Sequence, residues 1–335
     1  MELAKNGHPN AFPNPLVGAV IVKNDTIIGE GFHREFGKEH AEVQAIKSVK
    51  NKDLLKDASI YVNLEPCSHF GKTPPCSNLI IESGISEVII ASSDPNPLVG
   101  GKGIELLTNA GIRVITGILE TKTRNLNIRF FTFFEKKRPY IILKYAMTSD
   151  GFMADSESRS KWISNHYSRL LVHQWRGEEQ AVLVGTKTAV VDNPKLTNRY
   201  SPYGQPVRVV LDRENKLPNS FHLFDGKSLT LVFTMKVGTD SKNINYIYIN
   251  FLKDVISQLL EKLYERKIYS VIVEGGAQTL SSFIENDYWD EARIFIGSGI
   301  FSDGIKAPRI PVPPHQEFDI MGDTLLIYKN NANES

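Results

Sequence analysis

The segment of residues 40–76 reads HAEVQAIKSVKNKDLLKDASIYVNLEPCSHFGKTPPC, and it indicates an α/β fold for the first part of the chain. A helix is predicted over residues 39–50, where apolar side chains recur at helical spacing. Residues 59–64 form a short apolar run typical of a buried strand, and a second helix is predicted over residues 75–83. Strands that alternate with helices predict a largely buried sheet covered by helices.

Three side chains in this segment have the chemistry of zinc ligands: His40, Cys67 and Cys76. Three nitrogen and sulphur ligands leave one tetrahedral position open for water, which a catalytic zinc site requires. Glu42 lies beside them in the sequence, and a carboxylate that does not bind the metal can carry a proton from water to a leaving amine. An H-x-E motif followed by P-C-x-x-C is typical of zinc nucleobase deaminases, although eight residues separate the two cysteines here.

Other interpretations of these residues stay open at the level of sequence. His40 alone is compatible with a helix-capping residue, and the cysteines with buried small hydrophobic side chains or with one disulfide bridge. Two cysteines in 335 residues exclude a fold that is held together by several disulfides. The combination of the motifs favours one zinc site.

Composition excludes several classes of protein. The length of 335 residues suggests two domains, and a hydrophobic content of 41% excludes a disordered chain. With 39 basic and 38 acidic side chains the net charge is +1, which argues against a nucleic-acid binder with a basic face. No apolar run approaches the roughly 20 residues of a membrane span, and the N-terminal MELAKNGHPN lacks the apolar stretch of a signal peptide. We therefore expect no membrane association and a cytoplasmic location.

A second α/β series follows an aromatic and basic stretch at residues 130–139, which we interpret as a linker because it ends in a basic run and a proline. The predicted domains are residues 1–136 and 137–335. Strands of the second domain are predicted at residues 140–145, 181–184, 207–211, 229–233, 270–273, 291–296 and 324–328. Helices are predicted over residues 167–176, 253–265 and 277–285.

Several motifs, in the same order along both halves, resemble the bifunctional riboflavin-biosynthesis deaminase–reductase family. In the first half these are Pro13-Asn14-Pro15-Leu16-Val17-Gly18, the segment from Leu64 to Cys76, and Asp94-Pro95-Asn96-Pro97. In the second half they are Leu143-Lys144-Tyr145-Ala146, Asp150-Gly151, Ser160-Lys161-Trp162-Ile163, Asp192-Asn193-Pro194-Lys195-Leu196-Thr197 and Glu274-Gly275-Gly276. The resemblance covers nearly the whole chain.

The resemblance implies a cytidine-deaminase-like three-layer α/β/α domain, followed by a dihydrofolate-reductase-like α/β domain. It also implies two consecutive reactions on a small phosphorylated pyrimidine. The first is the zinc-dependent hydrolytic deamination of 2,5-diamino-6-ribosylamino-4(3H)-pyrimidinone 5′-phosphate. The second is the NADPH-dependent reduction of the ribosyl group to a ribityl chain.

Residue by residue, the resemblance implies roles in the deaminase domain. His40, Cys67 and Cys76 hold one zinc ion per chain, and Glu42 is the catalytic proton shuttle. Asn14, His33 and Lys72 contact the deaminase substrate. From the sequence alone, His33 is equally compatible with a histidine exposed at the end of a hairpin, and Lys72 with a solvated lysine.

The resemblance also implies two groups of residues in the reductase domain. Arginine side chains suit a phosphate, because a guanidinium group donates paired hydrogen bonds. Glycines after a strand allow a ligand to approach the backbone closely. Without the resemblance, Trp162 reads equally as a core aromatic, Arg176 as a surface cation, and the two glycines as a turn. The NADPH contacts are Ala146, Trp162, Thr188, Asp192, Gly275 and Gly276, and the substrate contacts are Ser160, Arg176, Leu196, Arg199 and Glu274.

Two other classes of function fit parts of the sequence but conflict with the rest. A zinc deaminase of another nucleoside or of nucleic acid, with an inactive C-terminal domain, conflicts with the balanced charge and the long spacer between the cysteines. A non-catalytic module with structural zinc conflicts with the presence of only three evident ligands. The family further implies a homo-oligomer formed through the reductase domain.

Overall fold

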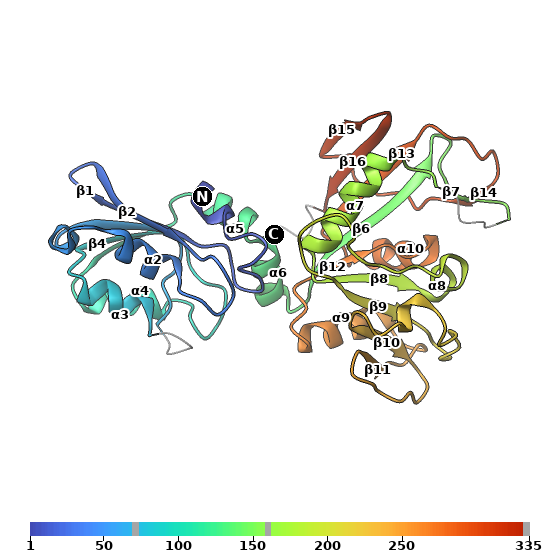
Figure 1. Ribbon diagram of the computed structural model, residues 1–335, viewed down its shortest axis with the longest axis horizontal. Helices are drawn as coiled ribbons and strands as arrows, with labels where there is room; N and C mark the ends of the chain where they lie inside the picture. Colours follow the sequence, from blue (N-terminus) through green and yellow to red (C-terminus); the bar gives the residue numbers. More distant parts are fainter. Residues whose placement is uncertain (69–73, 158–161, 331–335) are drawn as a thin grey trace. The chain divides into compact units, whose positions relative to one another are not determined.

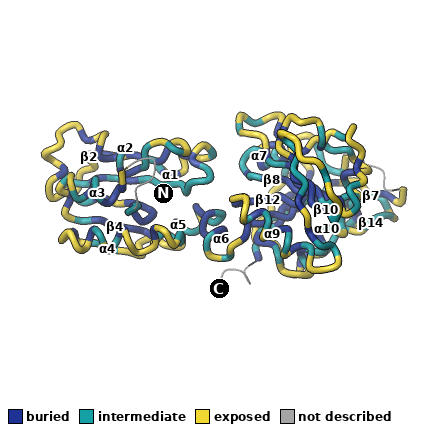
Figure 2. The backbone as a smooth tube through the Cα atoms, turned by 90° about the horizontal axis from the view of Figure 1, so that it is seen from below, coloured by how far each residue is buried: buried dark blue, intermediate teal, exposed yellow. Residues whose placement is uncertain are grey.

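The computed structural model describes residues 1–68, 74–157 and 162–330 of the chain. The chain divides into two compact units, Met1–Lys136 and Lys137–Ser335 (Figure 1). Each unit is built around its own large β-sheet. Most buried residues lie on the strands of these sheets, while exposed residues are most frequent in the turns and on the outer helices (Figure 2).

The sheet of the first unit has five strands in the order β2–β1–β3–β4–β5. Strand β1 runs antiparallel to β2 and β3, whereas β3, β4 and β5 run parallel to one another. The carboxyl ends of β3 and β4 therefore open at the same edge of the sheet, where ligands of α/β proteins commonly bind. The strands are β1 (Gly18–Lys23), β2 (Thr26–Phe32), β3 (Ser59–Leu64), β4 (Glu87–Ser92) and β5 (Arg113–Thr116).

Helices cover both faces of this sheet. Ala19 and Ile21 of β1 share a core cluster with residues of α2, α3 and α4. The preceding residue, Gly18, points to the opposite face, where an added Cβ atom would lie 2.9 Å from the backbone nitrogen of Ala4 in α1. The helical segments are α1 (Glu2–Lys5), α2 (Ala41–Ser48), α3 (Cys76–Glu82), α4 (Lys102–Asn109), α5 (Glu120–Leu126), α6 (Ile128–Lys136) and the 3₁₀ turn Lys52–Leu55.

Helix α2 lies unusually close to β2 because two glycines face it. A Cβ atom at Gly31 would lie 2.3 Å from the backbone nitrogen of Ala45, and one at Gly29 would lie 2.7 Å from the Ala45 carbonyl oxygen. Real Cβ atoms cannot occupy such positions, so glycine is required where the helix backbone meets the strand. This contact sets the position of the first turn of α2.

The interpretation of residues 130–139 as a linker is wrong for most of that stretch. Residues 128–136 form helix α6, and Phe130, Phe131 and Phe133 are buried. The aromatic side chains recur within a helical turn, and the rings of Phe130 and Phe134 meet with their centroids 4.9 Å apart. Burial of these rings stabilises a helix that composition alone presents as a break in the pattern.

The sheet of the second unit has nine strands in the order β11–β10–β9–β8–β12–β6–β13–β16–β15. All neighbouring strands from β11 across the sheet to β13 run parallel to one another. Strands β16 and β15 form a hairpin that adds antiparallel to β13 at one edge. The strands are β6 (Tyr140–Thr148), β8 (Ala181–Gly185), β9 (Val207–Leu211), β10 (Thr230–Thr234), β11 (Ile244–Tyr248), β12 (Ser270–Val273), β13 (Glu291–Gly297), β15 (Gln316–Ile320) and β16 (Asp323–Lys329). A separate ribbon pairs β7 (Phe152–Asp155) with β14 (Gly304–Lys306).

Helices also cover both faces of the second sheet. Ile294 of β13 shares the main core cluster with apolar residues of α9 and α10. Its neighbour Phe295 points to the other face and stacks on Trp175 of α7, with ring centroids 5.5 Å apart. The helical segments are α7 (His166–Glu178), α8 (Thr186–Asp192), α9 (Val255–Glu265), α10 (Ala277–Glu285) and the 3₁₀ turn His222–Phe224. Across the described residues, the helices are too short or too polar to cross a membrane.

Candidate active sites

Three elements of the first unit bring His40, Cys67 and Cys76 together. His40 is the N-cap of α2, Cys67 follows β3, and Cys76 is the first residue of α3. The Nδ1 atom of His40 lies 3.5 Å from Cys67 Sγ and 3.3 Å from Cys76 Sγ. The potential ligand atoms of all three residues lie within 4.8 Å of one another. Neither cysteine forms a disulfide, so the bridge left open by the sequence is wrong.

The donor set and its spacing fit zinc. Tetrahedral zinc with Zn–N and Zn–S bonds of about 2.0–2.3 Å separates neighbouring nitrogen and sulphur ligands by roughly 3.5 Å. The two nitrogen–sulphur distances of 3.5 and 3.3 Å have this size. The hydrogen bond with the Cys76 side chain lowers the pKa of the Cys67 thiol, and His40 acts in the same direction, while burial opposes them. A thiolate is the form of cysteine that binds metal.

Glu42 lies in the first turn of α2, and its side chain reaches the cluster. Only 3% of the residue is exposed, and its carboxyl group forms a hydrogen bond with the Cys76 side chain. Burial raises the pKa of the carboxyl to about 7, although His40 acts in the opposite direction. A carboxyl group with this pKa exchanges a proton readily at neutral pH.

A cavity of about 300 Å³ opens beside these residues. Its lining includes His40, Glu42 and Cys67 together with the predicted substrate contacts Asn14 and His33. The cavity thus joins residues from the loop before β1, the end of β2 and the first turn of α2. Lys72 lies outside the described residues.

His33 is not the exposed hairpin-end histidine that the sequence left open, because only 2% of it is accessible. Its Nδ1 atom lies 3.0 Å from the Glu39 carbonyl oxygen, which only accepts hydrogen bonds, so Nδ1 carries a proton. The Nε2 atom lies 3.0 Å from Asn14 Nδ2 and accepts from that amide in the neutral imidazole. This pair orients Asn14 with its Nδ2 atom toward His33.

Two further acidic residues, which no sequence motif identified as site residues, line this cavity. Asp94 follows β4 and lines the cavity, and burial raises its pKa to about 7. Glu65 follows β3 and accepts hydrogen bonds from four backbone N–H groups, with N–O distances of 2.9–3.2 Å, of Asp94, Gly101, Gly103 and Ile104. The available signal was their position, since both follow parallel strands that end at the edge where the cysteine cluster lies.

In the second unit, Arg176 and Glu274 form a buried ion pair. Arg176 Nε and one terminal nitrogen each donate to a Glu274 carboxylate oxygen at 2.7 Å. Burial alone raises the pKa of Glu274, but Arg176 opposes it and holds the value at about 2. The side chain of Arg176 is only 13% exposed, so the interpretation as a surface cation is wrong.

Lys144 of β6 lies close enough to this ion pair to interact with both members. Burial lowers the pKa of its ammonium group, while the Glu274 carboxylate acts in the opposite direction. Lys144 belongs to the motif Leu143-Lys144-Tyr145-Ala146, which alone assigns it no role. A lysine within the apolar run YIILKYAM is the signal that would have singled it out.

Three predicted cofactor residues lie close together: Thr188 of α8 meets the loop between β12 and α10, which contains Gly275 and Gly276. The backbone nitrogen of Gly276 donates to Thr188 Oγ1 at 2.7 Å, and Gly276 is the N-cap of α10. A Cβ atom at Gly275 would lie 3.2 Å from the backbone nitrogen of Gly185, so the two segments approach closely.

The remaining predicted residues of this unit are placed on several elements. Trp162 is 78% exposed, which rules out the alternative of a core aromatic, and Arg169 lies over its ring. Ala146 belongs to β6 and Asp192 is the exposed last residue of α8. Leu196 is buried with a positive φ of 49°, and Arg199 lies exposed three residues later. Ser160 lies outside the described residues.

The chemistry of the two units makes this chain a two-domain metabolic enzyme, in which a zinc-dependent deaminase is joined to a nucleotide-dependent reductase. Family models agree with this division. The cytidine and deoxycytidylate deaminase zinc-binding region matches residues 1–92, and the RibD C-terminal domain matches residues 139–311. The chain belongs to the RibD family of riboflavin-biosynthesis proteins.

Relatives match over nearly the whole length. The riboflavin biosynthesis protein RibD of Aquifex aeolicus is 43% identical over 311 residues, which cover 91% of this chain and 87% of the relative. That of Bacillus amyloliquefaciens is 42% identical over 320 residues, with 92% and 85% covered. The crystal structure of a diaminohydroxyphosphoribosylaminopyrimidine deaminase/5-amino-6-(5-phosphoribosylamino)uracil reductase from Thermotoga maritima has a TM-score of 0.86 and 41% identity, covering 98% of this chain and 95% of that one.

These matches confirm the expected family, the two α/β fold classes and the bifunctional activity. The chain is a deaminase and reductase of riboflavin biosynthesis that uses zinc in the first unit and NADPH in the second.

Proposed function

We propose that His40, Cys67 and Cys76 hold one zinc ion per chain and that Glu42 moves the proton in the deamination of 2,5-diamino-6-ribosylamino-4(3H)-pyrimidinone 5′-phosphate. The observation that carries this proposal is the convergence of the three ligand atoms within 4.8 Å beside a buried carboxyl group. When bound, zinc supplies the Lewis acidity that makes water nucleophilic at neutral pH.

The residues of the chain then supply the remaining steps. Glu42 accepts a proton from the attacking water on a carboxylate oxygen, and later gives it to the departing amine. Its pKa of about 7 suits both directions of transfer. Asn14, which His33 orients, and Lys72 contact the substrate in this proposal.

A metal analysis tests this assignment. Metal-replete protein is expected to contain about one zinc per chain, and His40→Ala or Cys67→Ala is expected to lose both zinc and ammonia release. Zinc retained at full stoichiometry in either variant would remove that residue from the ligand set. His8→Ala is the matched control, because His8 is exposed and does not belong to the described lining of the cavity.

For the reductase, we propose that Ala146, Trp162, Thr188, Asp192, Gly275 and Gly276 contact NADPH, while Ser160, Arg176, Leu196, Arg199 and Glu274 contact the ribotide. When bound, NADPH supplies the hydride. As the ribosyl ring opens, its oxygen must gain a proton, and the half-buried ammonium group of Lys144 is a donor beside Glu274. The carboxylate of Glu274 accepts both bonds from Arg176 and so fixes the guanidinium in one orientation.

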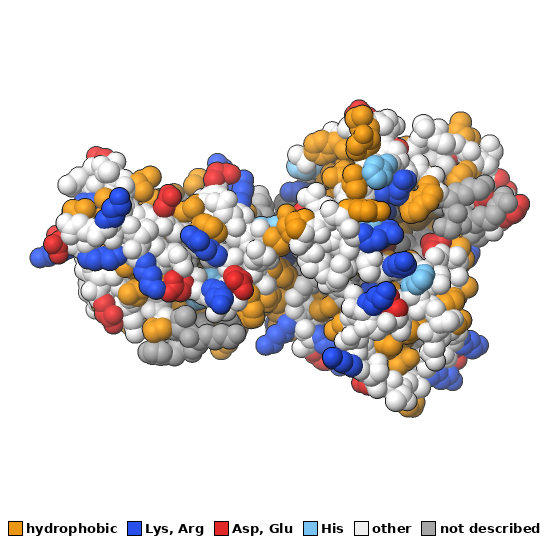
Figure 3. All heavy atoms as spheres, in the orientation of Figure 1, with side chains coloured by type: hydrophobic (Ala, Val, Ile, Leu, Met, Phe, Trp, Pro, Cys, Tyr) orange, Lys and Arg blue, Asp and Glu red, His pale blue; other side chains and the backbone are white. Residues whose placement is uncertain are grey.

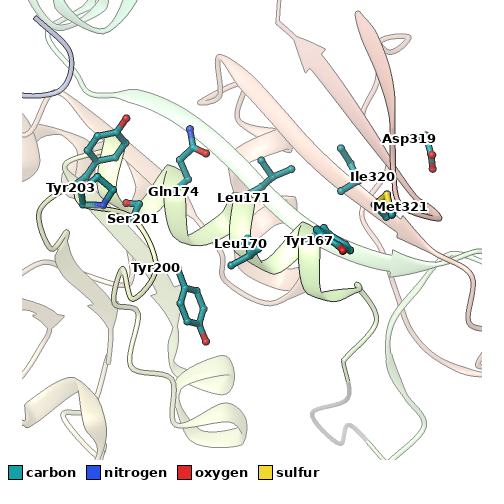
Figure 4. Close-up of a pocket in the computed structure, with 11 residues that line it drawn as sticks. Tyr167, Leu170, Leu171, Gln174, Tyr200, Ser201, Tyr203, Asp319, Ile320 and Met321 are labelled. Atoms are coloured by element: carbon teal, nitrogen blue, oxygen red, sulfur yellow. The ribbon is translucent and has the colours of Figure 1, made fainter. Parts of the chain in front are cut away.

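We also propose that two copies of the chain associate through the second unit. A groove of about 670 Å³ lies between α7, the loop at residues 200–203 and the turn before β16 (Figure 4). Asp319 is the one charged residue in its described lining, and the adjacent β15 is an edge strand that pairs with β16 alone among the described strands. Exposed apolar surface beside an edge strand suits an isologous contact with a second copy.

Light scattering tests the association. We expect a mass of twice the 37.6 kDa chain for the wild type and a shift toward the single chain for Leu170→Glu, which charges the groove. Val237→Glu, at a 97% exposed position outside the groove, is the control. A wild type that stays at the mass of a single chain at micromolar concentration would contradict the proposal.

The proposed partner of both sites is a small molecule and not a polynucleotide. Basic and acidic side chains are interspersed over the visible face of the first unit, which offers no continuous basic track there (Figure 3). The net charge of +1 supports the same proposal. Because thiolate ligands must stay reduced, we further propose a reducing compartment, the cytoplasm.

A further inference from the structure

Helix α7 presents one face to the loop that carries Arg199. A Cβ atom at Gly177 would lie 2.6 Å from Tyr203 Cβ, so this glycine lets the loop pack directly on the helix. One residue earlier, a terminal nitrogen of Arg176 donates to the Thr197 carbonyl oxygen at 3.3 Å. One turn earlier, His173 meets Arg199. A neighbouring face of α7, together with residues 200–203 of the same loop, lines the groove of Figure 4.

The backbone of this loop is held by Asn198. Its Nδ2 atom donates to the carbonyl oxygens of Ser201 and Tyr203 at 3.1 and 2.9 Å, and its Oδ1 atom accepts from the Ser201 nitrogen at 3.1 Å. These bonds fix the Cα position of Arg199 but leave its long, exposed side chain free to choose among rotamers. A second contact is needed to fix the guanidinium group.

His173 provides that contact. A terminal nitrogen of Arg199 lies 2.9 Å from His173 Nε2, and the Tyr200 ring packs edge-on against the imidazole with centroids 4.7 Å apart. Because arginine only donates, Nε2 accepts, and the imidazole carries its proton on Nδ1. Only 3% of His173 is exposed, so the ring itself is held in place by its surroundings.

The charges around His173 keep it in the accepting form. Burial lowers its pKa to about 4, and the nearby cations Arg176 and Arg199 act in the same direction, against a smaller effect of Glu274. The imidazole is therefore neutral throughout the physiological range. A lone pair on Nε2 stays available to the guanidinium.

We propose that His173 is a positioning residue of the reductase, which holds the Arg199 guanidinium in the orientation that receives the phosphate of the substrate. This inference rests on the proposed role of Arg199 as a substrate contact. A guanidinium that is already ordered before the substrate arrives loses less side-chain entropy on binding, so the contact strengthens binding of the phosphorylated substrate. His173 does not touch the reacting atoms in this assignment.

The test compares reductase kinetics of the full-length enzyme on the deaminated ribotide and on its dephosphorylated form. His173→Leu and His173→Asn are expected to raise KM for the phosphorylated substrate about tenfold, because each loses a hydrogen bond to a charged group. The values of kcat, KM for NADPH and KM for the dephosphorylated substrate are expected to stay within about twofold of wild type. His173→Gln is expected to restore KM, since its amide oxygen reaches further than that of asparagine.

Two variants separate the possible failures. His166→Leu, at an exposed position of the same helix, is the control for changes in α7 itself. If Arg199→Ala leaves the preference for the phosphorylated substrate unchanged, the proposed role of Arg199 is wrong. If Arg199→Ala abolishes that preference while His173→Asn keeps it, the inference about His173 alone is wrong. The asparagine and glutamine variants decide the matter even if His173→Leu fails to fold.

Discussion

The carboxyl group of Glu42 is kept out of water and beside the ligand cluster by the same structural feature. His40 caps α2 and Glu42 occupies the first turn, so the turn from loop to helix directs both side chains toward the cysteines. Acidic residues are also favoured at this end of a helix. Burial then raises the pKa of the carboxyl to about 7, which suits a proton carrier at neutral pH.

Glu42→Gln removes the proton carrier while keeping size and polarity. We expect zinc content to stay near one per chain and ammonia release to fall by about 10²–10⁴-fold, the usual contribution of a general acid–base group. Elemental analysis and a direct ammonia assay measure the two quantities on the same preparation. Deamination within a few-fold of wild type would exclude the proposed role.

The ion pair of Arg176 and Glu274 predicts a pH-dependent stability of the second unit. Glu274→Gln leaves a buried guanidinium without its carboxylate, so we expect a loss of about 3 kcal/mol of unfolding free energy at pH 7. The folded pKa of Glu274, about 2, lies below its ordinary value of 4.5. Its contribution is therefore complete above pH 4.5 and is lost as the pH falls toward 2.

Tryptophan fluorescence during urea unfolding measures this effect, because Trp162, Trp175 and Trp289, the three tryptophans of the chain, all belong to the second unit. The difference between wild type and Glu274→Gln is expected to shrink from pH 4.5 toward pH 2. Glu261→Gln, at an exposed position of α9, is the control. A difference that grows in acid would refute the assignment.

At the scale of elements, the approach of α2 to β2 positions the metal ligands. Gly31→Ala would place a methyl group 2.3 Å from the Ala45 backbone, so the helix must move. We expect a destabilisation of about 1–3 kcal/mol, as for other overpacked sites, together with reduced zinc content. Thermal unfolding and metal analysis check both, and Glu30→Ala, on the exposed side of the same strand, is the control. Full zinc content in Gly31→Ala would show that the ligands tolerate a shift of α2.

Elements with strong local patterns could be predicted from the sequence. The apolar runs 59–64, 207–211 and 270–273 are strands with the expected bounds. Strand β15 was missed because it is short and mostly exposed, and because Glu317 and Asp319 are of residue types depleted in strands. Helix α6 was missed because its aromatic residues were read as a break, although packing within the unit buries them.

The functional residues could likewise be predicted only where a local sequence pattern marks them. Ligand type and motif order were enough to predict His40, Cys67 and Cys76, because few residue types bind zinc. The bond of His33 to Asn14 joins residues 19 positions apart, and that of Arg176 to Glu274 joins residues 98 apart. No local spacing encodes such contacts, since they depend on how strands and helices are arranged in the folded unit.

At the scale of the whole molecule, two chemically independent sites lie on two units of one chain. In our proposal, the first uses thiolate and imidazole ligands, and the second uses a buried ion pair and glycine-lined backbone. The order of the reactions follows from the substrate, because the reductase acts on the deaminated product. A single polypeptide therefore supplies two consecutive steps.

The most direct test gives the metal-replete enzyme the diamino ribotide and NADPH, and records ammonia release and NADPH oxidation separately for the wild type and Glu42→Gln. For the wild type, we predict ammonia first and NADPH oxidation afterwards in equal amount. Glu42→Gln is predicted to oxidise NADPH only when the deaminated intermediate is supplied. Oxidation of NADPH by Glu42→Gln on the diamino substrate at the wild-type rate would contradict the account of a deaminase followed by a reductase.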